Sequence, residues 1–177
     1  MQQTLFALAA ILVFSTYAVN RHQTDAEVEH DAIAAEIETA VTEVARARLL
    51  DATRLAFDEQ DVGRPGIRTT PPTSTPGPDT GEPGGAPSGP APYDDVDDYH
   101  GWTETLAVPV GTDSVRVRAS AEVLYVHASD PSAPGGAGSP TTTKRVTVTA
   151  VELPAGALRG RVPARAEISR IVTPTSR

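Results

Sequence analysis

The chain opens on an uninterrupted apolar stretch. Leu5 to Val19 reads LFALAAILVFSTYAV, and no residue between Met1 and Asn20 is charged. A helix needs about 20 apolar residues to span a bilayer, and this stretch reaches that length only with its Gln and Thr flanks. Three interpretations stay open: a secretory signal, although no Lys or Arg precedes the stretch; a membrane anchor; or a helix that packs in the core of a polymer.

The following segment predicts that the apolar stretch continues as an amphipathic helix. Gln23 to Glu59 contains neither Pro nor Gly and is rich in the strong helix formers Ala, Glu, Arg and Leu. We therefore expect one helix from about Gln3 to about Glu59, on the order of 80 Å long. A narrow stripe recurs at alternating spacings of four and three: Ala26, His30, Ile33, Ile37, Ala40, Val44 and Ala47. An anchor followed by a separate coiled-coil stalk would have the same spacing.

After the helix, Val62 to Pro92 consists mostly of Pro, Gly, Thr and Ser. Such a segment has too few apolar side chains to fold by itself. It is expected to be an extended linker, or alternatively a loop packed across the domain.

The C-terminal half has the period-two alternation of half-buried strands. Val115–Tyr125 and Lys144–Leu153 are the strongest candidates, and Thr103–Val110 and Ala166–Thr173 are shorter ones. The Gly/Pro-rich segment Ser129–Pro140 is expected to be a long turn that joins the two strongest as an antiparallel hairpin.

The alternation predicts a meander of about four strands, in which Gly111 to Asp113 turns the first strand into the second. One face of this sheet is apolar and needs a cover. The second half of the long helix is the only candidate, through Leu49, Leu50, Leu55 and Phe57. The predicted fold class is α+β, with a long N-terminal helix packed on a small antiparallel sheet.

A run of acidic residues precedes the first expected strand, in the sequence YDDVDDYHGW. We favour a turn in which the Asp side chains accept hydrogen bonds from backbone N–H groups, with Tyr and Trp closing the edge of the core. The alternative is a calcium site, because Ca²⁺ binds several carboxylate oxygens; its ligands would be Asp94, Asp95, Asp97 and Asp98. The spacing is not that of an EF-hand loop.

Composition narrows the function classes. The net charge is −8 and no basic stripe is present, which argues against nucleic-acid binding. The chain has no Cys, so it has neither disulfides nor thiolate chemistry. No nucleophile elbow, zinc-protease motif, P-loop or dinucleotide fingerprint occurs, and the four His are scattered. We therefore expect that the protein is not an enzyme and has no cofactor other than the candidate Ca²⁺.

The order of an apolar-then-amphipathic helix, a variable loop and a small antiparallel sheet resembles the type IV pilin and pseudopilin superfamily. The start MQQTLFALAA is similar to that of pilin-like proteins, and LAFDE at the helix end with DDVDDYHG before the first strand is similar to motifs of minor-pilin-like proteins. The chain differs in having Leu5 where pilins carry Glu, and it has no acid before Asp25.

The resemblance implies a structural subunit of a type IV pilus-like filament, held in the inner membrane before assembly and extracellular afterwards. Its helices would bundle into a homo-oligomer. The expected assembly residues are Leu5, Phe6, Leu8, Ile11, Leu12, Val13, Phe14, Tyr17 and Val19. The alternatives are a pseudopilin of a secretion system, a single-pass membrane-anchored β-domain that binds a partner, and a secreted adhesin with a cleaved signal. The expected organisation is a hydrophobic helix (1–20), its amphipathic continuation (21–60), a linker (61–92) and a sheet domain (93–177).

Overall fold

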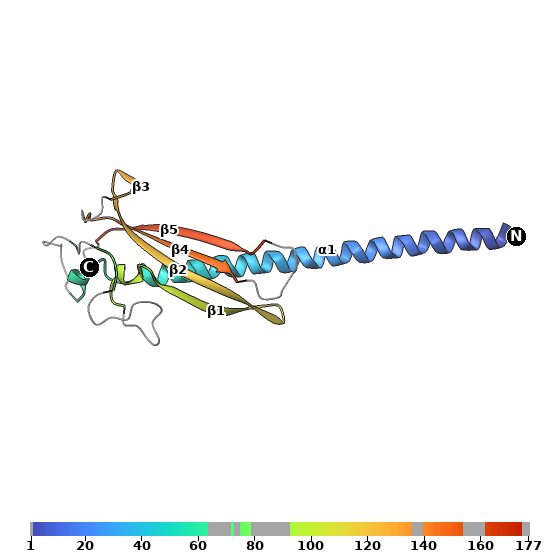
Figure 1. The fold of residues 1–177 in the computed structure, drawn as a ribbon, viewed down its shortest axis with the longest axis horizontal. Coiled ribbons are helices and arrows are strands. Elements are labelled where there is room, and N and C mark those ends of the chain that lie inside the picture. The colour runs from blue at the N-terminus through green and yellow to red at the C-terminus, as the bar shows by residue number, and fades with distance from the viewer. Residues whose placement is uncertain are drawn as a thin grey trace.

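One long helix lies along a small antiparallel sheet and extends far beyond it (Figure 1). The structure is a computed structural model and describes residues 2–63, 72, 75–78, 93–135, 140–153 and 162–174, without the side chains of Gln2 and Leu5. The elements are α1 (Gln2–Ala52), two short 3-10 helices, η1 (Glu59–Asp61) and η2 (Asp97–Tyr99), and five strands: β1 (Thr103–Val110), β2 (Asp113–His127), β3 (Asp130–Pro134), β4 (Lys144–Glu152) and β5 (Arg165–Val172). The predicted α+β class is confirmed. The predicted linker lies largely outside the described residues.

The four predicted strands form the sheet in the order β1-β2-β4-β5, with every neighbouring pair antiparallel. The expected pairing of the two strongest strands is confirmed, with Val123 opposite Val146 and Ala121 opposite Val148. The turn between β1 and β2 contains Gly111 at a φ of 55°. This left-handed conformation favours glycine because it has no Cβ.

One prediction about the sheet was wrong. The segment Ser129–Pro140, expected to be a turn, contains β3, which pairs with the end of β2 through Val126 and His127. Its Pro and Gly content masked the strand in the sequence. An edge strand tolerates Pro because only one of its sides takes part in the hydrogen-bonded ladder.

The second half of α1 covers the apolar face of the sheet, as expected. Its buried residues follow one another every three or four positions: Ile37, Val41, Ala45, Leu49 and Ala52. They share a core with the inward-facing residues of β2 and β4, among them Val117, Val123, Val146, Val148 and Ala150. Because residues alternate in direction along a strand, the same two strands present Arg, Thr and Glu to the opposite face.

The predicted stripe on the helix was only partly right. Ile33, Ile37, Ala40 and Val44 do face the core, but Ala26 and Ala47 are exposed, and Val41 and Ala45 were missed. A stripe with a strict seven-residue repeat drifts by about 20° per heptad around a straight helix. The buried face of α1 follows the straight helix instead.

The end of the helix was also predicted wrongly. α1 ends at Ala52 rather than near Glu59. The backbone of Ala56 instead pairs with the acidic turn, because its N–H donates to the carbonyl of Asp94 (3.2 Å) and its carbonyl accepts from the N–H of Val96 (2.9 Å). These tertiary bonds replace helical ones, so no Pro or Gly was needed to end the helix.

Because α1 ends at Ala52, not all of the residues expected to cover the sheet do so. Leu49 is in the core and Leu55 packs against it, but Leu50 is 42% exposed. Phe57 is buried outside that core, with its ring 4.5 Å from the Nζ of Lys144.

Polar contacts fix the position of the helix at the edges of the sheet. Arg48 forms an ion pair with Glu104 of β1 (2.8 Å). Glu36 accepts a hydrogen bond from the N–H of Gly111 in the β1–β2 turn (3.0 Å). These partners are partly exposed, so each contributes little stability. They fix the position of the helix along the sheet and add little to the free energy of the packing.

The packing can be tested with two truncations in the same helix. Ile37 is 1% exposed and Val28 is 64% exposed. We expect Ile37→Ala to lower the free energy of unfolding by about 3 kcal/mol, because it leaves a cavity against the sheet. Val28→Ala should change it by less than about 0.5 kcal/mol. Urea unfolding of the full-length chain in a mild nonionic detergent measures both, and equal losses would contradict the packing.

Candidate functional site

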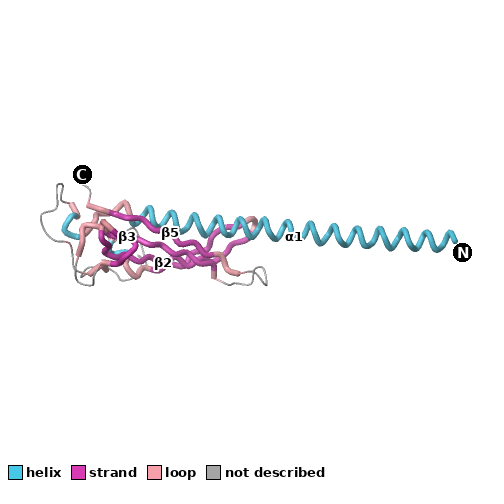
Figure 2. The backbone as a smooth tube through the Cα atoms, turned by 90° about the horizontal axis from the view of Figure 1, so that it is seen from above, coloured by secondary structure: helices cyan, strands magenta, loops and turns pink. Residues whose placement is uncertain are grey.

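The first candidate site is the N-terminal half of α1, which extends beyond the described strands of the sheet (Figures 1 and 2). Apart from Ala18, every described side chain from Gln3 to Glu29 is exposed. The predicted assembly residues Phe6, Leu8, Ile11, Leu12, Val13, Phe14, Tyr17 and Val19 are between 57% and 76% exposed. The side chain of Leu5 lies outside the described residues.

These apolar side chains surround the helix. At about 100° per residue, Ile11, Leu12, Val13 and Phe14 alone point to four different directions around the axis. A two-stranded coiled coil needs only a narrow apolar seam. A helix that is apolar all round is instead suited to being enclosed on every side, by other helices or by lipid. In the part of the chain that the structure describes, no helix meets the length and apolarity expected of a candidate membrane span.

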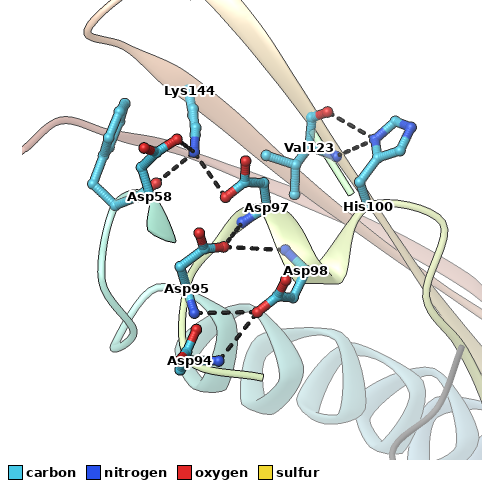
Figure 3. A network of polar contacts seen from close by, with 9 residues as sticks. Asp58, Asp94, Asp95, Asp97, Asp98, His100, Val123 and Lys144 are labelled. Carbon is cyan, nitrogen blue, oxygen red and sulfur yellow. Dashed lines mark hydrogen bonds and ion pairs between the residues drawn. The ribbon is translucent and has the colours of Figure 1, made fainter. Parts of the chain in front are cut away.

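The second candidate site is the acidic turn at the opposite end of the molecule, around η2 (Figure 3). Asp98 Oδ2 accepts hydrogen bonds from the backbone N–H of Asp94 (3.1 Å) and of Asp95 (3.2 Å). Asp95 Oδ1 accepts from the N–H of Asp97 (2.8 Å) and of Asp98 (3.3 Å). These bonds are the ones expected of an Asp-rich turn, so two of the four carboxylates hold the backbone of the turn.

Aromatic rings close the edge of the core beside this turn, as predicted. Tyr99 lies between Tyr93 and Trp102, with ring centroids 5.1 Å and 5.7 Å away. Tyr93 and Trp102 are buried. The indole Nε1 of Trp102 has no hydrogen-bond partner among the described residues.

His100 connects the turn to the sheet. Its Nδ1 lies 2.8 Å from the carbonyl oxygen of Val123 and 3.3 Å from the N–H of the same residue. The backbone hydrogen bonds of Gly101 and Trp102 with Ala121 are the last of that strand pairing before His100. The imidazole thus takes the place of the next residue of a strand, which assigns a structural role to one of the four scattered His.

Lys144 is the centre of the acidic site. Its side chain is 0% exposed, and its Nζ lies 3.0 Å from Asp97 Oδ1 and 3.6 Å from Asp58 Oδ1. The Nζ also donates to the carbonyl oxygen of Phe57 at 2.5 Å. Lys144 is the first residue of β4 and points inward with Val146 and Val148, so the alternation of the strand carries a charge into the core.

Asp95 is the third carboxyl residue of this cluster, beside Asp58 and Asp97. Burial raises the pKa of Asp95 to about 9, helped by a side-chain hydrogen bond to Asp97 and by the charges of Asp97 and Asp98, while Lys144 acts in the opposite direction. Asp95 is therefore protonated at neutral pH. A carboxylic acid next to a carboxylate can share its proton with that neighbour.

The structure changes the set of candidate calcium ligands. Oxygens of Asp58, Asp95 and Asp97 lie within 4.8 Å of one another. Asp94 is exposed and Asp98 accepts backbone bonds. The positive charge that contacts the buried oxygens is the ammonium of Lys144, so the donor set already has a cation. Calcium binding stays a prediction.

Sequence reasoning missed Asp58 and Lys144. A usable signal existed for the lysine, because Lys144 occupies an inward position of a strand that alternates through Val146, Val148 and Ala150. For Asp58 no local signal existed, since its place depends on the early end of α1.

Comparisons with protein-family models, with curated proteins and with solved structures gave no match.

The role of Asp98 in the turn can be tested by two substitutions. Asp98→Ala removes the acceptor of two backbone N–H groups and should lower the free energy of unfolding by about 2 kcal/mol. Asp98→Asn keeps an acceptor oxygen and should cost less than about 1 kcal/mol. Thermal unfolding followed by circular dichroism in the full-length chain compares them, and an equal cost would contradict the assigned role.

The protonated state of Asp95 predicts a pH dependence. Its folded-state pKa of about 9 lies above the ordinary value of 3.8, so the contribution of Asp95 to stability is fully present below pH 3.8 and is lost as the pH rises to about 9. Asp95→Asn keeps the acceptor oxygen and cannot ionise. Relative to wild type it should gain stability across this window, by at most about 1.4 kcal/mol per pH unit. A pH-independent difference in urea midpoints would refute the assignment.

Proposed function

We propose that the protein is a structural subunit of a type IV pilus-like extracellular filament, in which the N-terminal halves of many α1 helices bundle into a common core. The observation that carries the proposal is the exposed, all-round apolar surface of α1 over Phe6 to Val19. Before assembly the same surface would be held in the inner membrane.

The energetics favour enclosure of this surface. Burying a large aliphatic or aromatic side chain contributes about 1.5–3 kcal/mol, and eight such side chains lie exposed in this stretch. Contiguous apolar surface of this extent marks an interaction site. Since it faces all directions, a bundle of several helices would cover it, whereas a single partner helix would leave most of it exposed.

The shape of the molecule supports the same proposal. The 51 residues of α1 give a helix about 75 Å long, and the sheet packs only on its C-terminal part (Figure 2). When such helices are bundled by their free ends, the sheet domains are placed on the outside. The net charge of −8 suits a surface that faces water.

The rival proposal is a single-pass anchored β-domain that binds a partner, and the location of the wild-type chain separates the two. Electron microscopy of sheared surface material, with mass spectrometry of the chain in it, should find filaments that contain an intact N-terminal helix. A chain found solely in membrane fractions, without filaments, would favour the anchored domain.

Substitutions in the free half of the helix test the mechanism. Leu12→Arg or Phe14→Asp places a charge inside the proposed core, where desolvation costs several kcal/mol, and should abolish filaments. The sheet domain should remain folded, because both side chains are exposed, Leu12 at 66% and Phe14 at 73%. Gln23→Asp, an exposed position beyond the apolar stretch, is the matched control and should leave filaments in place. Normal filaments from Leu12→Arg and Phe14→Asp would defeat the proposal.

A further inference from the structure

The buried ammonium of Lys144 is in contact with the carboxyl group of Asp97 (Figure 3). The Nζ is 3.0 Å from Asp97 Oδ1, and both side chains are at most 3% exposed. The aromatic rings of Phe57 and Tyr125 lie 4.5 Å and 5.2 Å from the same nitrogen. Lysine is almost never fully buried in proteins unless it is paired.

We propose that Lys144 and Asp97 condense to form an amide, an intramolecular isopeptide cross-link between β4 and η2 that the folded chain makes by itself. The inference concerns a covalent modification of the sheet domain, and it does not depend on the proposed filament.

The reaction balances with the groups in the cluster. An ammonium proton of Lys144 passes to Asp58, whose Oδ1 is 3.6 Å away, and the amine lone pair then attacks Cγ of Asp97. A new C–N bond forms, one C–O bond of Asp97 breaks, and the oxygen leaves as water with two of the three ammonium protons. Nothing is oxidised or reduced, so no cofactor is needed.

Asp95 is placed to act as the general acid. Its side chain is hydrogen-bonded to the carboxyl group of Asp97, and oxygens of the two residues lie within 4.8 Å of each other. A proton donated there stabilises the negative charge that develops on oxygen during attack and helps the oxygen to leave. The second Nζ proton then restores Asp95, while Asp58 returns its proton to the departing water.

The geometry selects Asp97 over Asp58 as the carboxyl group that is attacked. Asp97 Oδ1 is the closer to Nζ, at 3.0 Å against 3.6 Å, and the hydrogen bond from Asp95 polarises Asp97. The carbonyl of Phe57, 2.5 Å from Nζ, holds the nitrogen in place. Groups held in contact and in a fixed orientation react far faster than the same groups in solution.

Burial also favours the product. An ion pair in a dry site has lost the water that stabilised both charges, and that loss can exceed the attraction between them. Condensation removes both charges, and the closed site limits the access of water for hydrolysis. The resulting bond would close a chain loop from Asp97 to Lys144 in a protein that has no Cys, and closing a loop restricts the unfolded state.

Tryptic digestion of the unfolded, full-length wild-type protein tests the proposal by mass spectrometry. Trypsin cleaves after Lys and Arg, so Asp97 falls in the peptide 69–116 and Lys144 ends the peptide 119–144. An amide at Lys144 blocks cleavage there. We expect peptide 69–116 joined to peptide 119–145, lighter by one water than the sum of the two.

Three variants control the assignment. Lys144→Arg keeps the positive charge but cannot form the amide, so the linked pair should be lost completely. Asp97→Asn should still cross-link, releasing ammonia in place of water, and should give a linked pair of the same mass as wild type. Asp95→Asn cannot transfer a proton, and we expect about 100-fold slower cross-linking in freshly synthesised protein.

The wild-type digest by itself can overturn the proposal. Separate peptides 69–116 and 119–144 from folded wild-type protein would show that the pair stays ionic. A linked pair that contains peptide 55–68, in which Asp58 lies, would overturn Asp97 as the partner.

Discussion

The packing of one apolar sheet face against the second half of α1 is the contact on which the rest of the structure depends. A four-stranded meander cannot leave its Val-rich face in water, and among the elements that the structure describes the helix is long and apolar enough to cover it. The sheet needs only the part of α1 from about Ile33 to Ala52. The apolar side chains of the remaining part of the helix, from Phe6 to Val19, therefore stay exposed in the part of the chain that the structure describes.

The same contact places charges at the far end of the core. Where α1 ends, the chain turns away and pairs with the acidic turn through Ala56. Asp58 follows two residues after Ala56, and its carboxylate lies 3.6 Å from the Nζ of Lys144, which points inward from the start of β4. Because side chains alternate in direction along β4, Lys144 points into the protein and not to solvent. Its charge is therefore compensated by carboxylates from other segments of the chain. η2 and the segment after the helix supply them.

The two candidate sites thus lie at opposite ends of the molecule and depend on different interactions, apolar in one and polar in the other. The free end of α1 is apolar and would be stabilised by contact with other copies. The acidic turn is polar, and the carboxyl groups of Asp95, Asp97 and Asp98 are buried with partners inside the chain. In the filament that we propose, subunits would be joined at one end, and the sheet domain at the other end would need to stay folded. In a chain without disulfides, the buried Lys144 cluster is the contact best placed to hold that end closed.

The sequence by itself determined the class of the fold and the position of the exposed helix. The absence of Pro and Gly from Gln23 to Glu59 and the alternation in four strands are local patterns, and local patterns reflect burial on one face. The end of α1, strand β3 and the Lys144 cluster were decided only by the tertiary structure. The helix stops because Ala56 finds backbone partners in residues 94–96, about 40 positions along the chain, and Asp58 meets Lys144 only as a result. Contacts between distant segments leave no period in the sequence, so only the folded chain reveals them.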